Sequence, residues 1–140
     1  MYRKTIDKMK RKLEAAGLYP LKAQAELSTR ILKERLDVIL PWAMEEAGMD
    51  MWIVLSRENC EDPIIHTLFT WDMPEARRIS ILIFHRERTT GVIRRMAVGM
   101  HSPEMSGIYE NVQAENETVW EAAGRVVAEL APEKIAGNRS

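Results

Sequence analysis

Two short, almost purely apolar runs, MWIVL at 51–55 and ISILIF at 79–84, limit the folds that are open to this chain. A run of this kind, without alternating polar residues, is typical of a strand buried on both faces, as in the interior of an α/β sheet. A third run, GVIRRMAVG at 91–99, alternates in part, and only the polar link HRERTT separates it from the second. We therefore expect the second and third runs to pair as an antiparallel hairpin.

Two helical patterns precede these strands. In residues 3–16, apolar positions recur at steps of three and four, and Gly17 with Pro20 marks the end of the helix. Residues 23–47 form a longer pattern that contains Pro41. Proline has no N–H to donate and its ring crowds the carbonyl four residues earlier, so we expect a kink or a break there. Gly48 is the expected C-terminal stop.

The C-terminal part predicts one more helix and one short strand. Residues 116–130 carry an apolar stripe at helical spacing, with Asn116 as the expected N-cap and Pro132 beyond the end. KIAG at 134–137 has the character of a strand. Helix-linked strands together with one hairpin predict an α/β fold in which a mixed sheet, with one antiparallel hairpin, is covered by helices.

Composition and charge narrow the class of protein. A chain of 140 residues has the length of one domain, and its single cysteine, Cys60, excludes an internal disulfide. No run of 18 apolar residues and no signal-peptide pattern occurs, so we expect a cytoplasmic protein without a membrane partner. A pI near 6.3 argues against a nucleic-acid partner.

The charge is unevenly distributed along the chain. Residues 1–16 contain six bases and two acids, a net charge of +4, whereas residues 99–133 contain seven acids and Arg125, a net charge of −6. Two ends of opposite sign predict either mutual docking or a polar surface for a partner.

Chemically reactive side chains are concentrated directly after the first strand. They are Arg57, Glu58, Asn59, Cys60, Glu61, Asp62 and His66. Cys60, Asp62 and His66 with Glu58 contain the atoms of a metal site, and Cys60 with His66 those of a nucleophilic pair, but their spacing matches no metal or catalytic motif. The segment follows an interior strand and is about 20 residues long, and both properties are typical of functional loops. We therefore expect it to be functional without a complete catalytic or metal-binding set of its own.

A wider pattern resembles the N-terminal domain of the creatinase/prolidase family, the "pita-bread" metallopeptidases that include Xaa-Pro aminopeptidases. The resemblance covers about residues 30–140 and includes RLDVILPWAMEEAGMDMWIVLSRENCEDPIIHTL, EARRISILIFHR and the closing PEKIAGNRS. The matching positions before the loop are Arg35, Ile39, Met44, Glu46, Gly48, Asp50, Trp52, Ile53 and Val54. Asn59 is similar to the loop asparagine of the family, His66, Thr67 and Leu68 stand near its Y-L-T, and Arg77 and Arg78 precede the next strand. The family's loop glycine is absent here.

The resemblance implies a ribonuclease-H-like fold and a non-catalytic role. Residues 1–22 would be an N-terminal helical extension and residues 23–140 the family-like domain. Two divalent metal ions (Mn, Co or Zn) would lie in a separate C-terminal catalytic domain, held by two Asp, one His and two Glu, and this chain itself would hold no metal or other cofactor. The domain would restrict access to Xaa-Pro or other short peptides and contribute to a homodimer. The implied substrate-gating residues are Arg57, Glu58, Asn59, Asp62 and His66.

Two other classes of function stay open from the sequence. One is a free-standing α/β binding module without a peptidase partner domain. The other is a small hydrolase that uses the 57–66 loop. A reading frame that continues beyond Ser140 and encodes the five metal ligands would favour the metallopeptidase hypothesis over the binding module. Activity of the isolated chain would identify the small hydrolase.

Overall fold

The structure is a computed structural model, and it describes residues 2–17, 21–73, 76 and 78–138. Some residues of the sequence patterns lie outside this part of the chain. They are Pro20, the predicted stop of the first helix, Glu75 at the start of EARRISILIFHR, Arg77 of the arginine pair, and the last two residues of PEKIAGNRS.

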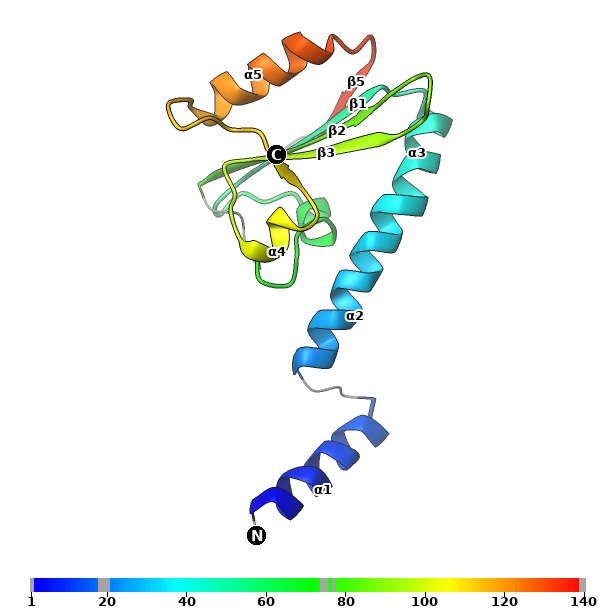
Figure 1. Cartoon of the computed structure of the whole chain (residues 1–140), viewed down its shortest axis with the longest axis vertical. Coiled ribbons are helices and arrows are strands. Elements are labelled where there is room, and N and C mark those ends of the chain that lie inside the picture. The colour runs from blue at the N-terminus through cyan, green and yellow to red at the C-terminus, as the bar shows by residue number, and fades with distance from the viewer. Residues whose placement is uncertain (1, 18–20, 74–75, 77, 139–140) are drawn as a thin grey trace.

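The centre of the molecule is a five-stranded mixed open sheet with the strand order β4-β3-β2-β1-β5 (Figure 1). The strands are β1 (Met51–Arg57), β2 (Ile79–Arg86), β3 (Ile93–Val98), β4 (Glu110–Asn111) and β5 (Ile135–Gly137). β2 is antiparallel to β1 and to β3, whereas β5 is parallel to β1 and β4 is parallel to β3. The predicted mixed sheet and its hairpin are confirmed, and β4 is an addition that the sequence did not predict.

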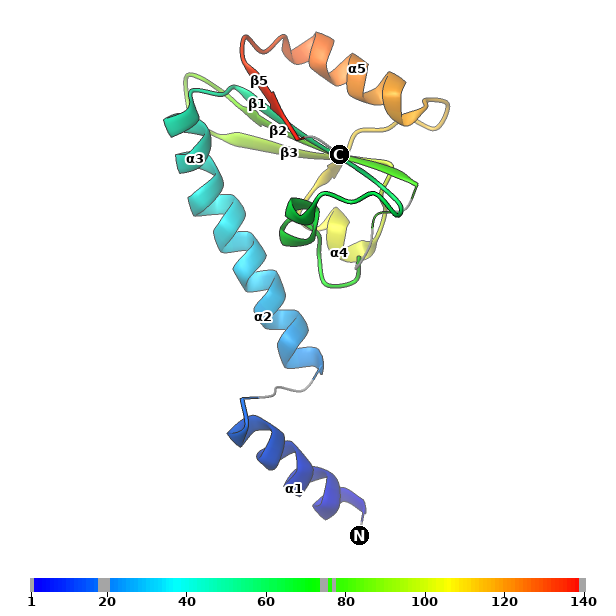
Figure 2. The same ribbon diagram turned by 180° about the vertical axis from the view of Figure 1, so that it is seen from behind.

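Helices and turns cover both faces of the sheet. The elements outside the sheet are α1 (Tyr2–Ala15), which covers neither face, α2 (Leu21–Glu34), a π-helical turn (Arg35–Ile39), α3 (Leu40–Ala47), a 3₁₀ turn (Pro63–Thr67), α4 (Pro103–Ser106) and α5 (Val119–Leu130). α5 lies on one face, and α3, the 3₁₀ turn and α4 lie on the other (Figure 2). The core is accordingly divided into two clusters, one around Phe84 beneath α3 and one around Ile83 beneath α5. None of the described helices has the length and apolar character that crossing a bilayer requires.

Pro41 does not break the long helix. The π-helical turn comes directly before it, and within this turn the N–H of Leu40 donates to the carbonyl of Arg35, five residues earlier. Pro41 occupies the first turn of α3, where a missing N–H is tolerated. The sequence predicted a kink or a break at Pro41. The widened π-helical turn instead accommodates the proline ring and its missing N–H. Gly48 ends α3 with a φ of 65°, as expected for a left-handed C-cap.

The start of α5 differs from the prediction. Thr118, not Asn116, is the N-cap: its hydroxyl accepts from the N–H of Glu121 at 3.2 Å, and the Glu121 carboxylate accepts from the N–H of Thr118 at 3.0 Å. This reciprocal pair is a capping box, which satisfies two helix-terminal N–H groups at once and so outcompetes an isolated asparagine cap.

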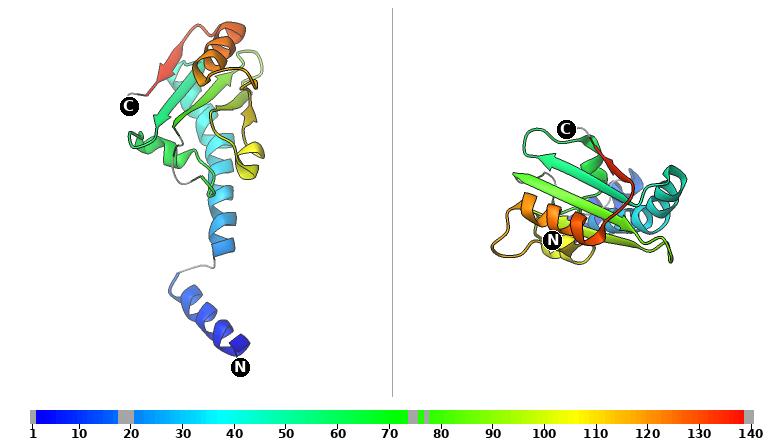
Figure 3. Two further views of the ribbon diagram at one scale, coloured as in Figure 1. Left: turned by 90° about the vertical axis from the view of Figure 1, so that its left-hand side faces the viewer. Right: turned by 90° about the horizontal axis from the view of Figure 1, so that it is seen from above.

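The basic and the acidic segments do not dock on each other. α1 lies beyond the free end of α2, and α5 lies at the opposite end of the molecule (Figures 1 and 3). Every described residue from 2 to 17 is exposed. Of the two explanations for the uneven charge, only a surface for another partner is compatible with this arrangement.

Candidate functional site

The stretch predicted as a loop, residues 57–75, is in its described part a folded segment that contributes to the core together with Ala76. Six of the described side chains of residues 57–76 are buried beneath α3 and against the sheet. They are Ile65, Leu68, Phe69, Thr70, Met73 and Ala76. The segment therefore has a fixed shape on which the polar side chains of its first half are displayed.

The segment begins with a tight turn that depends on Asn59. The N–H of Cys60 donates to the carbonyl of Arg57 at 3.0 Å, and Asn59 has a φ of 62°. A positive φ at the third position of such a turn favours glycine or asparagine. The N–H of Glu58 also donates to the carbonyl of Arg78 at 2.8 Å, which continues the ladder between β1 and β2. The backbone role of Asn59 explains this residue without any contact to a substrate.

Asp62 starts the 3₁₀ turn. Its extended backbone, with a φ of −71° and a ψ of 131°, is the conformation imposed by the following Pro63. One carboxylate oxygen accepts from the N–H of Ile64 at 3.0 Å, and the other accepts from the side-chain amide of Asn138 at 3.2 Å. Both oxygens serve the shape of the segment, so Asp62 has a structural role.

The side chain of Asn138 takes the place of a strand backbone beside β1. Its side-chain oxygen accepts from the N–H of Leu55 at 2.7 Å, and its amide nitrogen donates to the carbonyl of Leu55 at 2.9 Å. These are the two bonds that a neighbouring strand would make at this position. The residue after β5 thus links the sheet edge, through Asp62, to the start of the 3₁₀ turn.

Glu61 holds the two ends of the segment together. One carboxylate oxygen accepts from the N–H of Ala76 at 2.7 Å, and the other lies 3.0 Å from Nε2 of His66. Sequence reasoning did not single out this role, because no local pattern connects a glutamate to a backbone N–H fifteen residues later.

Two further side chains anchor the segment from outside. The guanidinium of Arg35, in the π-helical turn, donates to the carbonyl of Thr67. The hydroxyl of Tyr109 donates to the carbonyl of Leu68 at 2.6 Å, and burial raises the pKa of this phenol above its ordinary value. The π-helical turn and the chain before β4 therefore both hold the segment, at the neighbouring carbonyls of Thr67 and Leu68.

The five predicted gating residues separate into three groups. Asn59 and Asp62 shape the backbone, whereas Arg57 and Glu58 are exposed and make no ion pair with any residue that the structure describes. His66 is half-exposed and lines a groove of about 280 Å³ between α2 and the 3₁₀ turn. The groove does not include Arg57 or Glu58, so the available side chains lie at two places on the same segment.

The catalytic and metal-binding alternatives are not assembled in this part of the molecule. Cys60 is exposed, and the imidazole of His66 faces Glu61. Among the residues that the structure describes, no three His, Cys, Asp or Glu side chains are arranged to hold a metal ion. No reaction step is therefore assigned to these residues.

A second polar cluster, at the other end of β1, is structural. The carboxylate of Asp50 accepts from Nε and Nη2 of Arg88 at 3.1 and 2.8 Å, and from the N–H groups of Glu133 and Lys134, both at 3.1 Å. The hydrogen bond from Arg88 is the main cause that lowers the pKa of Asp50 to about 2. With four donors around it, one on Oδ1 and three on Oδ2, this carboxylate joins the β2–β3 hairpin to the start of β5.

Comparisons of the chain with protein-family models, with curated proteins and with solved structures found no match. The function must therefore be argued from the residues and their geometry.

Proposed function

We propose that this chain is the non-catalytic N-terminal domain of a dinuclear metallopeptidase similar to the creatinase/prolidase family. In this role it restricts the access of Xaa-Pro or other short peptides to a C-terminal catalytic domain and contributes to a homodimer. The two divalent ions, Mn, Co or Zn, belong to that catalytic domain. A cytoplasmic location accompanies the proposal.

Support for the family comes from the roles of the matching residues. Arg35 holds the segment after β1, Gly48 ends α3 in a left-handed conformation, and Asp50 joins the hairpin to β5. Asn138 completes the ladder beside β1. Because these positions each make a specific structural contact, the pattern that they form is one that a shared fold would require. A ribonuclease-H-like topology, proposed from the resemblance, is compatible with an antiparallel β1-β2-β3 set that β5 extends in parallel.

The observation that carries the gating role is the exposure of Arg57 and Glu58 on a fixed turn. A guanidinium recognises a carboxylate, and a carboxylate recognises an ammonium group. A short peptide carries one of each, at its two termini. Side chains that make no ion pair with the described residues and are attached to a fixed turn are suited to position such termini for a neighbouring active site.

The direct test is the reading frame beyond the codon for Ser140. We expect it to encode a domain that supplies two Asp, one His and two Glu as metal ligands. In the full protein, Arg57→Ala and His66→Ala should lower kcat/KM for Xaa-Pro dipeptides and tripeptides. A stop codon directly after Ser140 would contradict this proposal and favour the free-standing binding module.

The isolated chain provides the complementary assay. With added Mn²⁺, Co²⁺ or Zn²⁺ it should not hydrolyse Xaa-Pro peptides. Metal-dependent turnover that Glu58→Ala and His66→Ala abolish would identify the small hydrolase built on residues 57–66 instead.

A further inference from the structure

α1 is an amphipathic helix whose apolar side has no partner among the described residues. Tyr2, Ile6, Met9 and Leu13 follow one another at steps of four and three, so they form a single stripe along the helix. Their exposed fractions are 87%, 52%, 59% and 44%. A helix of 14 residues that buries nothing is marginal in water, so α1 gains stability from any surface that covers this stripe.

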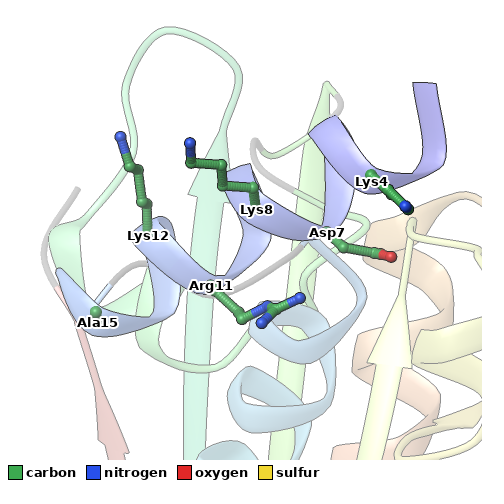
Figure 4. Close-up of a pocket in the computed structure, with 6 residues that line it drawn as sticks. All are labelled: Lys4, Asp7, Lys8, Arg11, Lys12 and Ala15. Carbon is green, nitrogen blue, oxygen red and sulfur yellow. The ribbon is translucent and has the colours of Figure 1, made fainter. Parts of the chain in front are cut away.

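Basic side chains border the stripe and fill the opposite side. At 100° per residue, Arg3 and Lys10 fall on one flank of the stripe and Lys12 on the other. Figure 4 shows Lys4, Lys8 and Arg11 extending from the remaining surface of the helix, with Asp7 among them, and the flanking Lys12 beside them. The long stems of flanking lysines and arginines can lie along apolar surface while their charges stay in a polar layer.

Two protein surfaces of this chain fit α1 poorly. α2 carries Lys22, Arg30 and Lys33 against Glu26 and Glu34, a net charge of +1, so it offers no net negative surface to a helix segment of net charge +4. Most acids of the 99–133 segment already have partners: Glu110 pairs with Arg94, Glu117 and Glu129 pair with Arg125, and Glu133 pairs with Arg88. Neither α2 nor the acidic segment, in this copy or a second one, therefore offers an open negative surface of matching size. A nucleic acid would neutralise the bases but leave the apolar stripe in water.

We propose that α1 binds the surface of an anionic membrane. The apolar stripe would enter the boundary between headgroups and acyl chains, and the surrounding bases would contact the anionic headgroups. The sequence led us to expect no membrane partner because it contains no run long enough to span a bilayer. A helix that lies in the membrane surface does not need such a run. The inference concerns α1 alone and is independent of the proposed peptidase role of residues 57–66.

The test is co-sedimentation of the full 140-residue chain with lipid vesicles. We expect binding to vesicles of phosphatidylcholine with phosphatidylserine, weak or no binding to phosphatidylcholine alone, and loss of binding as the salt concentration rises. Ile6→Asp and Leu13→Asp should each weaken binding by about tenfold or more. Val92→Asp is the matched control, because Val92 is apolar and 62% exposed but lies next to the β2–β3 hairpin turn, outside α1.

Several results would overturn the proposal. They are the absence of binding, equal binding to neutral and anionic vesicles, and equal loss in Val92→Asp. Binding of a nucleic-acid duplex that Ile6→Asp leaves intact, without vesicle binding, would assign the basic side to nucleic acid. A dimer in analytical ultracentrifugation that Ile6→Asp dissociates, again without vesicle binding, would assign the stripe to a second copy. Because α1 buries nothing, the urea midpoint of each variant should match that of the wild type, which shows that the sheet remains folded.

Discussion

α1 and the segment 57–76 differ in opposite ways: α1 has a regular backbone but is exposed, whereas the segment has an irregular backbone but contains buried side chains. α1 is a continuous helix with an apolar stripe, yet it has no buried residue. Among its described residues after β1, the segment 57–76 has a short 3₁₀ turn and otherwise irregular backbone, yet Ile65 in it is completely buried. Helical periodicity therefore predicts the local conformation of a segment but not whether another part of the molecule covers it. Burial in an irregular segment requires particular anchors, here Arg35, Glu61 and Tyr109.

The largest difference between the two regions should come from truncating one apolar side chain in each. Ile65→Ala removes a completely buried side chain, and we expect the free energy of unfolding to fall by about 2–5 kcal/mol. Leu13→Ala should change it by less than about 0.5 kcal/mol, because Leu13 is exposed. Urea denaturation followed by tryptophan fluorescence measures both. If Leu13→Ala lowered the free energy of unfolding as much as Ile65→Ala, α1 would pack on the sheet and the two regions would not differ in burial.

Lowering the pH tests the stability of the sheet separately from that of α1, because the carboxylates with lowered pKa values lie outside α1. The pKa of Asp50 is about 2 in the folded protein, below the value of about 3.9 for an unfolded chain, so its contribution is present above pH 4, roughly, and is lost as the pH falls toward 2. Glu117, whose pKa the Arg125 hydrogen bond also lowers to about 2, contributes in the same direction. We expect Asp50→Asn to be less stable than the wild type at neutral pH and to lose less stability on acidification. Parallel pH profiles of the melting temperature for the two proteins would contradict the role assigned to Asp50.

A smaller effect is expected at the start of the 3₁₀ turn. Asp62→Ala removes the cap on Ile64 and the bond to Asn138, and we expect a loss of about 0.5–2 kcal/mol in the free energy of unfolding. Asp62→Asn is the matched variant, because an amide oxygen can still accept from the N–H of Ile64. If both variants are as stable as the wild type, the segment is not held by its cap.

The smallest effects should come from the displayed side chains of the same segment. Arg57→Ala and His66→Ala should each change the free energy of unfolding by less than about 0.5 kcal/mol, since neither side chain is buried. In the full protein the same changes should reduce kcat/KM for short peptides. Destabilisation above about 2 kcal/mol, with unchanged kinetics in the full protein, would instead place Arg57 and His66 among the anchors.

The sequence predicted the parts of the fold that local patterns determine. The apolar runs at β1 and β2, the hairpin and the helical spacing all depend on neighbouring residues, and each was found close to its predicted position. β4 has two residues and exists only because Met96 and Ala97 of β3 pair with it, so no local pattern announces it. The capping box at Thr118 was visible as T-x-x-E but was overlooked in favour of Asn116.

The candidate site was predictable in composition but not in function. The concentration of polar residues after β1 is evident in the sequence, and Pro63 already indicated that Asp62 shapes the backbone. The sequence could not separate Arg57 and Glu58 from Asn59, because that distinction depends on a positive φ and on the absence of ion pairs with described residues. The anchoring by Glu61 depends on Ala76 and was equally hidden.

The side chain of Asn138 affects whether a strand from another molecule can add to the edge of the sheet. An exposed strand edge with free N–H and C=O groups is a template onto which a strand from another chain can add, and such addition leads to aggregation. β5 covers only Met51, Trp52 and Ile53 of β1, and the amide of Asn138 then occupies both polar groups of Leu55. One asparagine side chain therefore occupies, at Leu55, the backbone groups of β1 that a strand longer than β5 would have paired.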